Sequence, residues 1–195
     1  MPKEYYFVSD LHIGGDGDLQ ECSFEDEFIA FLSNLEKKDK DKELIIIGDS
    51  FGLWEFTELN GMDKLEELIR HHQRLFNQFQ KSGEKIRITI IPGNHDYELA
   101  CYPQFIERLK DFNIKLEPEI SLIKEIGDHK IWIEHGMQQD ENNRMPDFGN
   151  HNANPLGYFI TRLFVATAGK FSALIVSITV EAVAHASGLP PKVEP

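Results

Sequence analysis

Seven polar side chains that bind metal ions or transfer protons follow directly after apolar runs in the sequence. In chain order they are Asp10, His12, Asp49, Asn94, His95, Asp96 and His135. Carboxylate and carboxamide oxygens and imidazole nitrogens coordinate divalent cations, and imidazole also exchanges protons near neutral pH. Because the set mixes nitrogen and oxygen donors and contains no thiolate, it favours Mn, Fe, Zn or Co over Mg or Ca, with Mn as our first expectation.

The spacing of these residues suits a site for two ions. Two divalent cations about 3.5 to 4 Å apart can hold a phosphoryl group and activate a water for in-line attack. We expect Asp49 to bridge both ions, because it follows the most central apolar run and a glycine precedes it. Asp10 and His12 would hold the first ion with Asp49, and Asn94 and His135 the second.

Three further residues are candidates for catalysis and substrate binding. His95 would lie beside the substrate phosphate as a cation or as a proton donor to the leaving oxygen, with Asp96 orienting it. Arg144 is our candidate for gripping an additional phosphate, and Arg162 is a second one. Taken singly, such residues are more often turn formers or structural histidines, so the hypothesis depends on their meeting at one place.

The elements predicted around these residues would bring them together. The apolar runs 5–8, 44–47 and 86–91 are typical of strands in a parallel sheet buried on both faces, and amphipathic helical patterns at 24–35 and 63–79 lie between them. Ser23 and Asp63 are the expected N-caps. A helix beginning at Pro103 and a hairpin from 120–126 and 130–133 complete the pattern. In such α/β folds the site lies at the carboxyl ends of the strands.

Three other segments have open interpretations. The aromatic stretch 50–56 packs in the core, which we favour, or lines an apolar substrate groove. The glycine-rich stretch 13–18 is a plain surface loop or a loop that admits substrate. His71 and His72 are expected on the surface, because no acidic or cysteine partner stands four residues from either.

Composition limits the class of protein. The 195 residues suit a single domain, 1–195, and the net charge of −13 argues against nucleic-acid binding through a basic surface. Cys22 and Cys101 are too few and too far apart for a disulfide framework. Together with the lack of a leader before the first strand, they indicate a cytoplasmic protein.

The character of the sequence changes after Gly136. We expect residues 137–195 to form an apolar C-terminal cap or an interface, because 158–189 carries few charges. Homo-oligomerisation through this segment is one use that we consider, and contact with a membrane surface is considered but not favoured. Its longest apolar run is shorter than the about 20 residues that a spanning helix needs.

The ordered motifs resemble those of a known family. Asp10-x-His12, Gly48-Asp49, Gly93-Asn94-His95-Asp96 and His135-Gly136 are similar to the motifs of calcineurin-like metallophosphoesterases. The resemblance implies an α/β fold, a four-layer αββα sandwich, with a dinuclear metal site that hydrolyses phosphomonoesters, phosphodiesters or pyrophosphates through an activated water. Within the family the stretch 48–54 looks most like the branch of UDP-2,3-diacylglucosamine pyrophosphohydrolase. A phosphorylated small molecule or a lipid-linked nucleotide is therefore the expected substrate.

Two departures from the family pattern bear on activity. The acidic residue usual three positions after the bridging aspartate is Gly52 here, and no Gly-His-x-His follows His135. The sandwich would then be incomplete at the C-terminus, and the metal site would be filled differently or bind metal weakly. The alternative to an enzyme is a catalytically weak scaffold of the same family that binds a partner.

Overall fold

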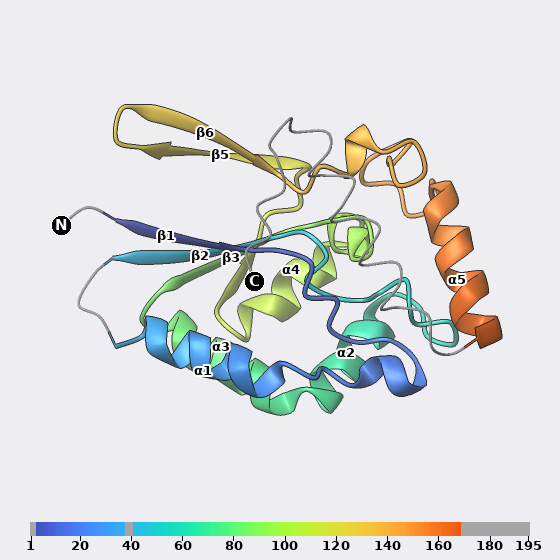
Figure 1. The fold of residues 1–195 in the computed structure, drawn as a ribbon, viewed down its shortest axis with the longest axis horizontal. Coiled ribbons are helices and arrows are strands. Elements are labelled where there is room, and N and C mark those ends of the chain that lie inside the picture. The colour runs from blue at the N-terminus through green and yellow to red at the C-terminus, as the bar shows by residue number, and fades with distance from the viewer. Residues whose placement is uncertain (1–2, 38–40, 169–195) are drawn as a thin grey trace, which may run out of the picture.

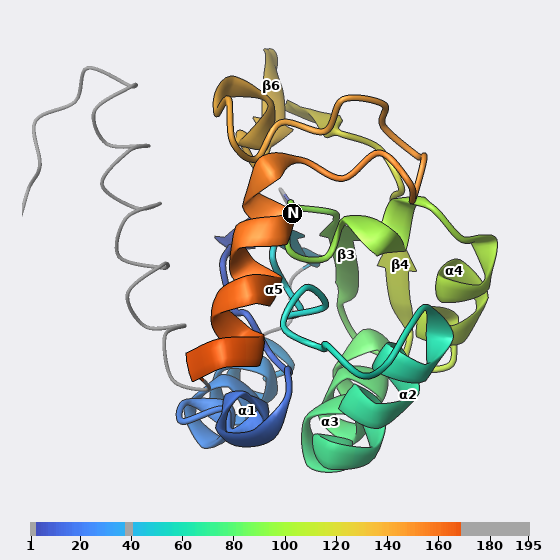
Figure 2. The ribbon, with the colours of Figure 1, turned by 90° about the vertical axis from the view of Figure 1, so that its right-hand side faces the viewer.

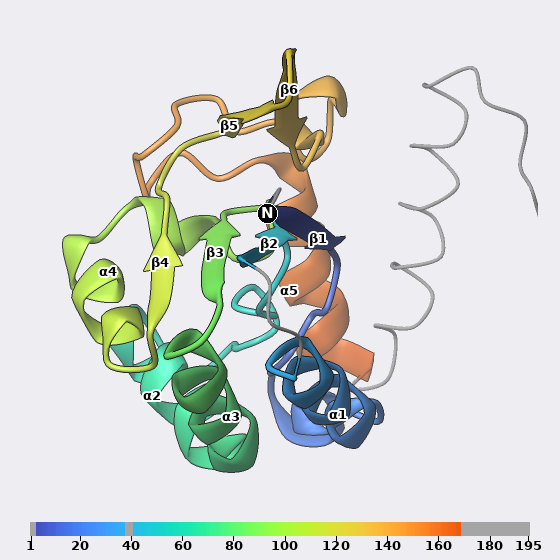
Figure 3. The same cartoon turned by 90° about the vertical axis from the view of Figure 1, so that its left-hand side faces the viewer.

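A computed structural model describes residues 3–37 and 41–168. Its centre is a parallel sheet in the order β1 (Glu4–Val8), β2 (Lys42–Ile47), β3 (Arg87–Ile91) and β4 (Ile114–Leu116). The register pairs Phe7 with Ile45 and Ile46 with Ile90, so the carboxyl ends of β1, β2 and β3 lie at one edge. The α/β fold class is confirmed, and Figure 3 shows the four strands side by side.

One face of the parallel sheet is covered by helices. They are α1 (Glu25–Leu35), α2 (Met62–His71), α3 (Gln73–Gly83) and α4 (Pro103–Lys110), and Figure 1 shows α1 and α3 beneath the strands. The main core cluster joins Leu32, Phe76 and Phe79 to the strand residues Ile46 and Ile90, all at most 1% exposed. The apolar periodicity of both helical patterns therefore marks the buried side, as predicted.

The opposite face carries an antiparallel hairpin, β5 (Ser121–Ile126) and β6 (His129–Glu134). Ile45 and Ile91 alternate with the helix-facing residues of their strands and pack against Ile133 of β6. Glu43 of β2 also joins the two layers, accepting hydrogen bonds from Lys124 of β5 at 2.7 Å and from Thr89 of β3 at 2.8 Å. These contacts fix the end of β6 over the carboxyl edge of the parallel sheet.

A last helix, α5 (Leu156–Ala168), stands at the end of the molecule where the strands stop (Figures 1 and 2). Short 3-10 turns at Gly17–Gln20, Tyr97–Ala100 and Met137–Gln139 belong to the surrounding loops. Among the described helices none has the length and apolar character needed to cross a bilayer. Most of the predicted apolar segment 158–189 lies outside the described residues.

Several local predictions differ from the structure. Neither Ser23 nor Asp63 is an N-cap, because the capping positions of α1 and α2 are Phe24 and Gly61. The pattern 63–79 forms two helices, broken at His72 with φ −103° and ψ 37°. His72 is buried rather than exposed, and its Nδ1 lies 2.6 Å from Glu25. A contact between side chains of different helices gives no periodic signal in the sequence, so the pattern did not predict it.

Candidate metal and catalytic site

The loops after β1, β2 and β3 run together along one sheet edge. Backbone hydrogen bonds join Asp10 to Gly48 at 3.2 Å and His12 to Asp49 at 2.9 Å, and Ile13 forms a parallel bridge with Phe51. The β1 loop therefore continues beside the β2 loop beyond the end of the sheet. This pairing carries the side chains of both loops to the same place.

The backbone is left-handed at three predicted ligands. The φ angles are 56° at Asp10, 45° at His12 and 50° at Asp49. A non-glycine residue in this region is uncommon, although aspartate and histidine tolerate it better than most, and such residues cluster at functional sites. The preceding Gly48 has φ 72°, and a Cβ there would overlap the ring of His135. The sequence thus concentrates backbone strain where the predicted ligands lie.

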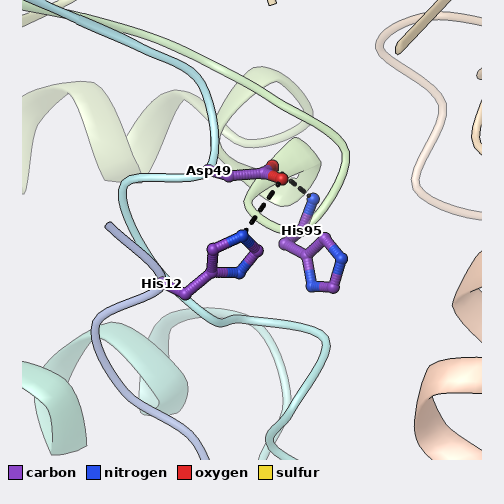
Figure 4. Close-up of side chains that lie close together, drawn as sticks. All are labelled: His12, Asp49 and His95. Carbon is purple, nitrogen blue, oxygen red and sulfur yellow. Dashed lines mark hydrogen bonds and ion pairs between the residues drawn. The ribbon is translucent and has the colours of Figure 1, made fainter. Parts of the chain in front are cut away.

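Asp49 is the centre of the site and is 1% exposed. One carboxylate oxygen, Oδ2, lies 3.2 Å from His135 Nε2 and 3.6 Å from His12 Nε2. The other, Oδ1, accepts the backbone N–H of His95 at 2.8 Å. Figure 4 shows the carboxylate reaching toward His12 and the backbone nitrogen of His95. Asp49 therefore lies between His135, His12 and the backbone of His95, and its role as the bridging ligand stays a prediction.

Two groups of donor atoms around Asp49 are compact enough to hold metal ions. One group is His12, Asp49 and His95, and the other is Asp10, Asp49 and His135. Within each group the donor atoms lie within 4.8 Å of one another. Asn94 adds its side-chain oxygen 3.2 Å from His135 Nε2. The chemistry of these donors fits divalent cations, with nitrogen and anionic oxygen on both sides of one carboxylate. Their roles as ligands remain predictions, while their convergence is a feature of the fold.

The ring of His135 is oriented for coordination. Its Nδ1 lies 3.0 Å from the carbonyl oxygen of Ile47, which fixes this nitrogen as the donor. The other nitrogen, Nε2, then faces Asp49 and Asn94. Histidine ligands of metals are commonly held in this way through their second ring nitrogen.

Asp96 lies in a different position from the one predicted. We expected it to orient the His95 ring, but its carboxylate accepts four backbone N–H groups instead. The donors are Gly93 at 2.6 Å, Ser50 at 2.7 Å, Asp49 at 3.2 Å and Phe51 at 3.3 Å. Asp96 is fully buried and ties the β3 loop to the β2 loop. Its place is under the site, where it holds backbone rather than a ring.

The side chain that meets His95 is Glu55, which the sequence did not single out. Glu55 Oε1 lies 2.6 Å from His95 Nδ1, and both side chains are 7% exposed. The other neighbours of the His95 ring are Trp54, with centroids 4.6 Å apart, and His12, also at 4.6 Å. Glu55 is the one charged residue in the aromatic stretch 50–56, which looks like core sequence, and this was the only signal of a role.

Electrostatics separate the three imidazoles. Burial lowers the pKa of His12, which favours the neutral ring. Burial would also lower the pKa of His95 and of His135, but Glu55 and Asp49 outweigh it and raise these pKa values to about 9 and about 10. Burial would raise the pKa of Asp49, yet the charges on His135 and His95 hold it well below its usual range. In the metal-free protein Asp49 is therefore a carboxylate between two cationic rings.

The two arginines that we considered for binding an additional phosphate, Arg144 and Arg162, lie in different surroundings. Arg144 is exposed, and no hydrogen bond or ion pair in the described part of the chain joins it to Asp49 or its neighbours. Arg162 of α5 donates to the carbonyl oxygens of Phe56 at 2.6 Å and Thr57 at 2.9 Å, so it holds the aromatic stretch. That stretch packs as core, as favoured, with Phe51, Leu53, Trp54 and Phe56 at most 1% exposed.

Comparison with known sequences gives one match. The family described as calcineurin-like phosphoesterase matches residues 4–169, which include every residue of the site. A comparison with curated proteins found no significant match.

Proposed function

The chain belongs to the calcineurin-like phosphoesterase family, and on this premise we propose that it hydrolyses a phosphate ester with two divalent cations held around Asp49. The observation that carries this proposal is the shared position of Asp49 in both donor groups. Asp10 and His135 would hold one cation with it, with Asn94 alongside; this differs from the predicted grouping of Asp10 with His12, because the donor atoms of Asp10 lie in the group of His135. His12 would hold the other.

The residues divide the work between charge and proton transfer. When bound, the cations would draw electron density from the phosphoryl group and lower the pKa of a water molecule. Asp49 and Asp10 supply the negative charge that keeps cations at this edge. His95, whose pKa is raised to about 9, is cationic at neutral pH and can donate its proton to the leaving oxygen.

We further propose Mn as the physiological metal and the cytoplasm as the compartment. The mixed nitrogen and oxygen donors support a transition metal of this kind. Cys22 and Cys101 are both free thiols, which supports a reducing compartment. A phosphorylated small molecule or a lipid-linked nucleotide, the substrate class of the branch that the stretch 48–54 resembles, is our proposed substrate, with Arg144 as a contact for a second phosphate.

The test compares Asp49→Asn with a surface control. Asp49→Asn keeps the shape of the side chain but removes its charge, and we expect loss of bound Mn by elemental analysis and a fall of at least about 1000-fold in hydrolysis of bis-p-nitrophenyl phosphate. The control, Asp26→Asn, removes an exposed carboxylate that pairs with Arg74 at 2.7 Å. It should retain the metal content and the rate of the unchanged protein.

Two outcomes would contradict the proposal. An Asp49→Asn protein with full activity would show that the reaction does not use this carboxylate. A natural chain that binds Mn at Asp49 but hydrolyses neither monoesters nor diesters would favour the scaffold alternative, for which the missing Gly-His-x-His is the supporting observation.

A further inference from the structure

We propose that Glu55 is a positioning residue that holds the His95 ring with its Nε2 atom directed at the leaving group of the substrate. This inference rests on the proposed function and extends it to a residue six positions after Asp49. Glu55 Oε1 lies 2.6 Å from His95 Nδ1, which is closer than its distance of 3.9 Å from His12 Nδ1. A carboxylate at Nδ1 makes this nitrogen the donor and leaves Nε2 for the substrate.

The backbone around Glu55 is fixed on both sides. Its carbonyl oxygen accepts the N–H of Asp16 at 3.1 Å, and the preceding residue, Trp54, donates its N–H to the carbonyl oxygen of His95 at 3.2 Å. Asp16 also accepts the N–H of Thr57 at 2.6 Å. The backbone of Glu55 is therefore held to the β1 loop and to the β3 loop, which places its carboxylate beside His95.

The two carboxylate oxygens of Glu55 differ in their hydrogen bonding. Oε2 is buried and lacks a hydrogen-bond partner among the described residues. A buried acceptor without a hydrogen-bond partner lowers stability. Among the described residues, the contact with His95 is therefore the hydrogen bond that holds the Glu55 carboxylate.

Position 52, where the family pattern has an acidic residue, has no room for a side chain in this structure. A Cβ at Gly52 would lie 2.7 Å from the carbonyl oxygen of Gly14 and 3.1 Å from Glu55 Oε2. The space that a side chain at 52 would need is thus occupied by the β1 loop and by the Glu55 carboxylate itself. The family pattern has an acidic residue at position 52. In this structure the carboxylate of Glu55 occupies the space beside that position.

The chain contains a matched control pair. His72 Nδ1 lies 2.6 Å from Glu25 Oε2, the His72 ring is also buried, and its Nε2 is unpaired among the described residues. This pair joins helices away from Asp49. Glu25→Gln therefore perturbs a histidine–carboxylate contact of the same length and similar burial without touching the site.

The experiment uses two esters that differ in their need for a proton. A p-nitrophenyl ester releases a stable phenolate anion, whereas the leaving oxygen of an alkyl ester must be protonated as its bond to phosphorus breaks. We expect Glu55→Met to reduce kcat on the alkyl ester by about 100-fold and Glu55→Gln by about 10-fold. For both variants we expect less than about a threefold change on the p-nitrophenyl ester, with KM and Mn content unchanged. Glu25→Gln should leave both rates unchanged.

A second readout does not depend on turnover. In the metal-free protein, the Nδ1 proton of His95 should give a strongly downfield NMR signal that Glu55→Met abolishes and Glu25→Gln preserves. Equal losses on both esters, no loss on either, or a His95 signal that persists in Glu55→Met would overturn the inference. A natural chain without metal-dependent hydrolysis would refute the proposed function instead, and the NMR signal would still decide whether Glu55 holds His95.

Discussion

Replacing Asp96 should destabilise the protein far more than it changes the chemistry. Its carboxylate is fully buried and accepts N–H groups from Gly93, Asp49, Ser50 and Phe51. Asp96→Ala would leave these donors unpaired in the core. Leaving a buried donor unpaired costs about 1 to 3 kcal/mol, so the two short bonds alone predict a loss of roughly 2 to 6 kcal/mol. That is a large part of the about 5 to 15 kcal/mol by which a domain is stable.

Urea unfolding followed by circular dichroism measures this loss. Asp96→Asn is the milder variant, because its side-chain oxygen can still accept two N–H groups while its amide meets the other two. We expect about half the loss of Asp96→Ala, with an unchanged dependence of the unfolding free energy on urea. Asp16→Ala is the control, since Asp16 is only partly buried and accepts two bonds, both from Thr57. It should lose only about 1 to 2 kcal/mol.

The result that would refute this reasoning is specific. An Asp96→Asn protein with an unchanged urea midpoint and a kcat lowered about 100-fold would place Asp96 in the chemistry. That outcome would restore the role predicted from the sequence and would mean that the four backbone contacts contribute little. A lowered midpoint, with activity retained in the folded fraction, would support the structural role.

Four further predictions concern the metal site and its surroundings. The pKa of His135 is raised to about 10 from 6.5, so its pair with Asp49 should stabilise the metal-free protein fully below pH 6.5. The Tm in EDTA should therefore fall as the pH rises toward 10. A Tm that rises over this range would contradict the expected direction. Mn binding must displace the same proton, so calorimetry in two buffers should detect proton release and an affinity that increases from pH 6 to pH 9. Gly48→Ala places a Cβ against the His135 ring at φ 72°, and it should cost at least about 1 to 2 kcal/mol in unfolding free energy and lower the Mn content; normal Mn content would contradict the close approach. Arg162→Met removes both bonds to the aromatic stretch and should speed amide hydrogen exchange in α5, whereas unchanged exchange would show that the helix is held by packing alone.

Much of the architecture follows from local patterns in the sequence. The apolar runs ending before Ser9, Gly48 and Pro92 predict strands that are buried on both faces, and the structure has them as adjacent parallel strands. The burial is confirmed for β2 and β3 but is wrong for β1, which lies at the end of the described strand order with Phe7 44% exposed. Phe28, Leu32 and Leu35 predict the buried side of α1 correctly. Such patterns work because a residue's burial in a helix or strand depends mainly on its position in the repeat.

Short or irregular features were beyond these patterns. The strand β4 has only three residues, Ile114–Leu116, so its alternation of apolar and polar residues is too short to predict a strand. The break at His72 depends on a buried contact with Glu25 from a helix 47 residues away in sequence. Local propensity carries no information about a partner supplied from so far along the chain.

The sequence by itself determined that seven donor side chains stand after apolar runs, and from this alone their convergence at one sheet edge was predictable. Only the tertiary structure decided which carboxylate meets which ring. Asp96 is next to His95 in the chain, yet it turns beneath the loops to accept backbone N–H groups, while Glu55 reaches His95 from 40 residues away. The physical reason is that strand direction sets where a loop begins, but side-chain pairing depends on how three loops pack against each other.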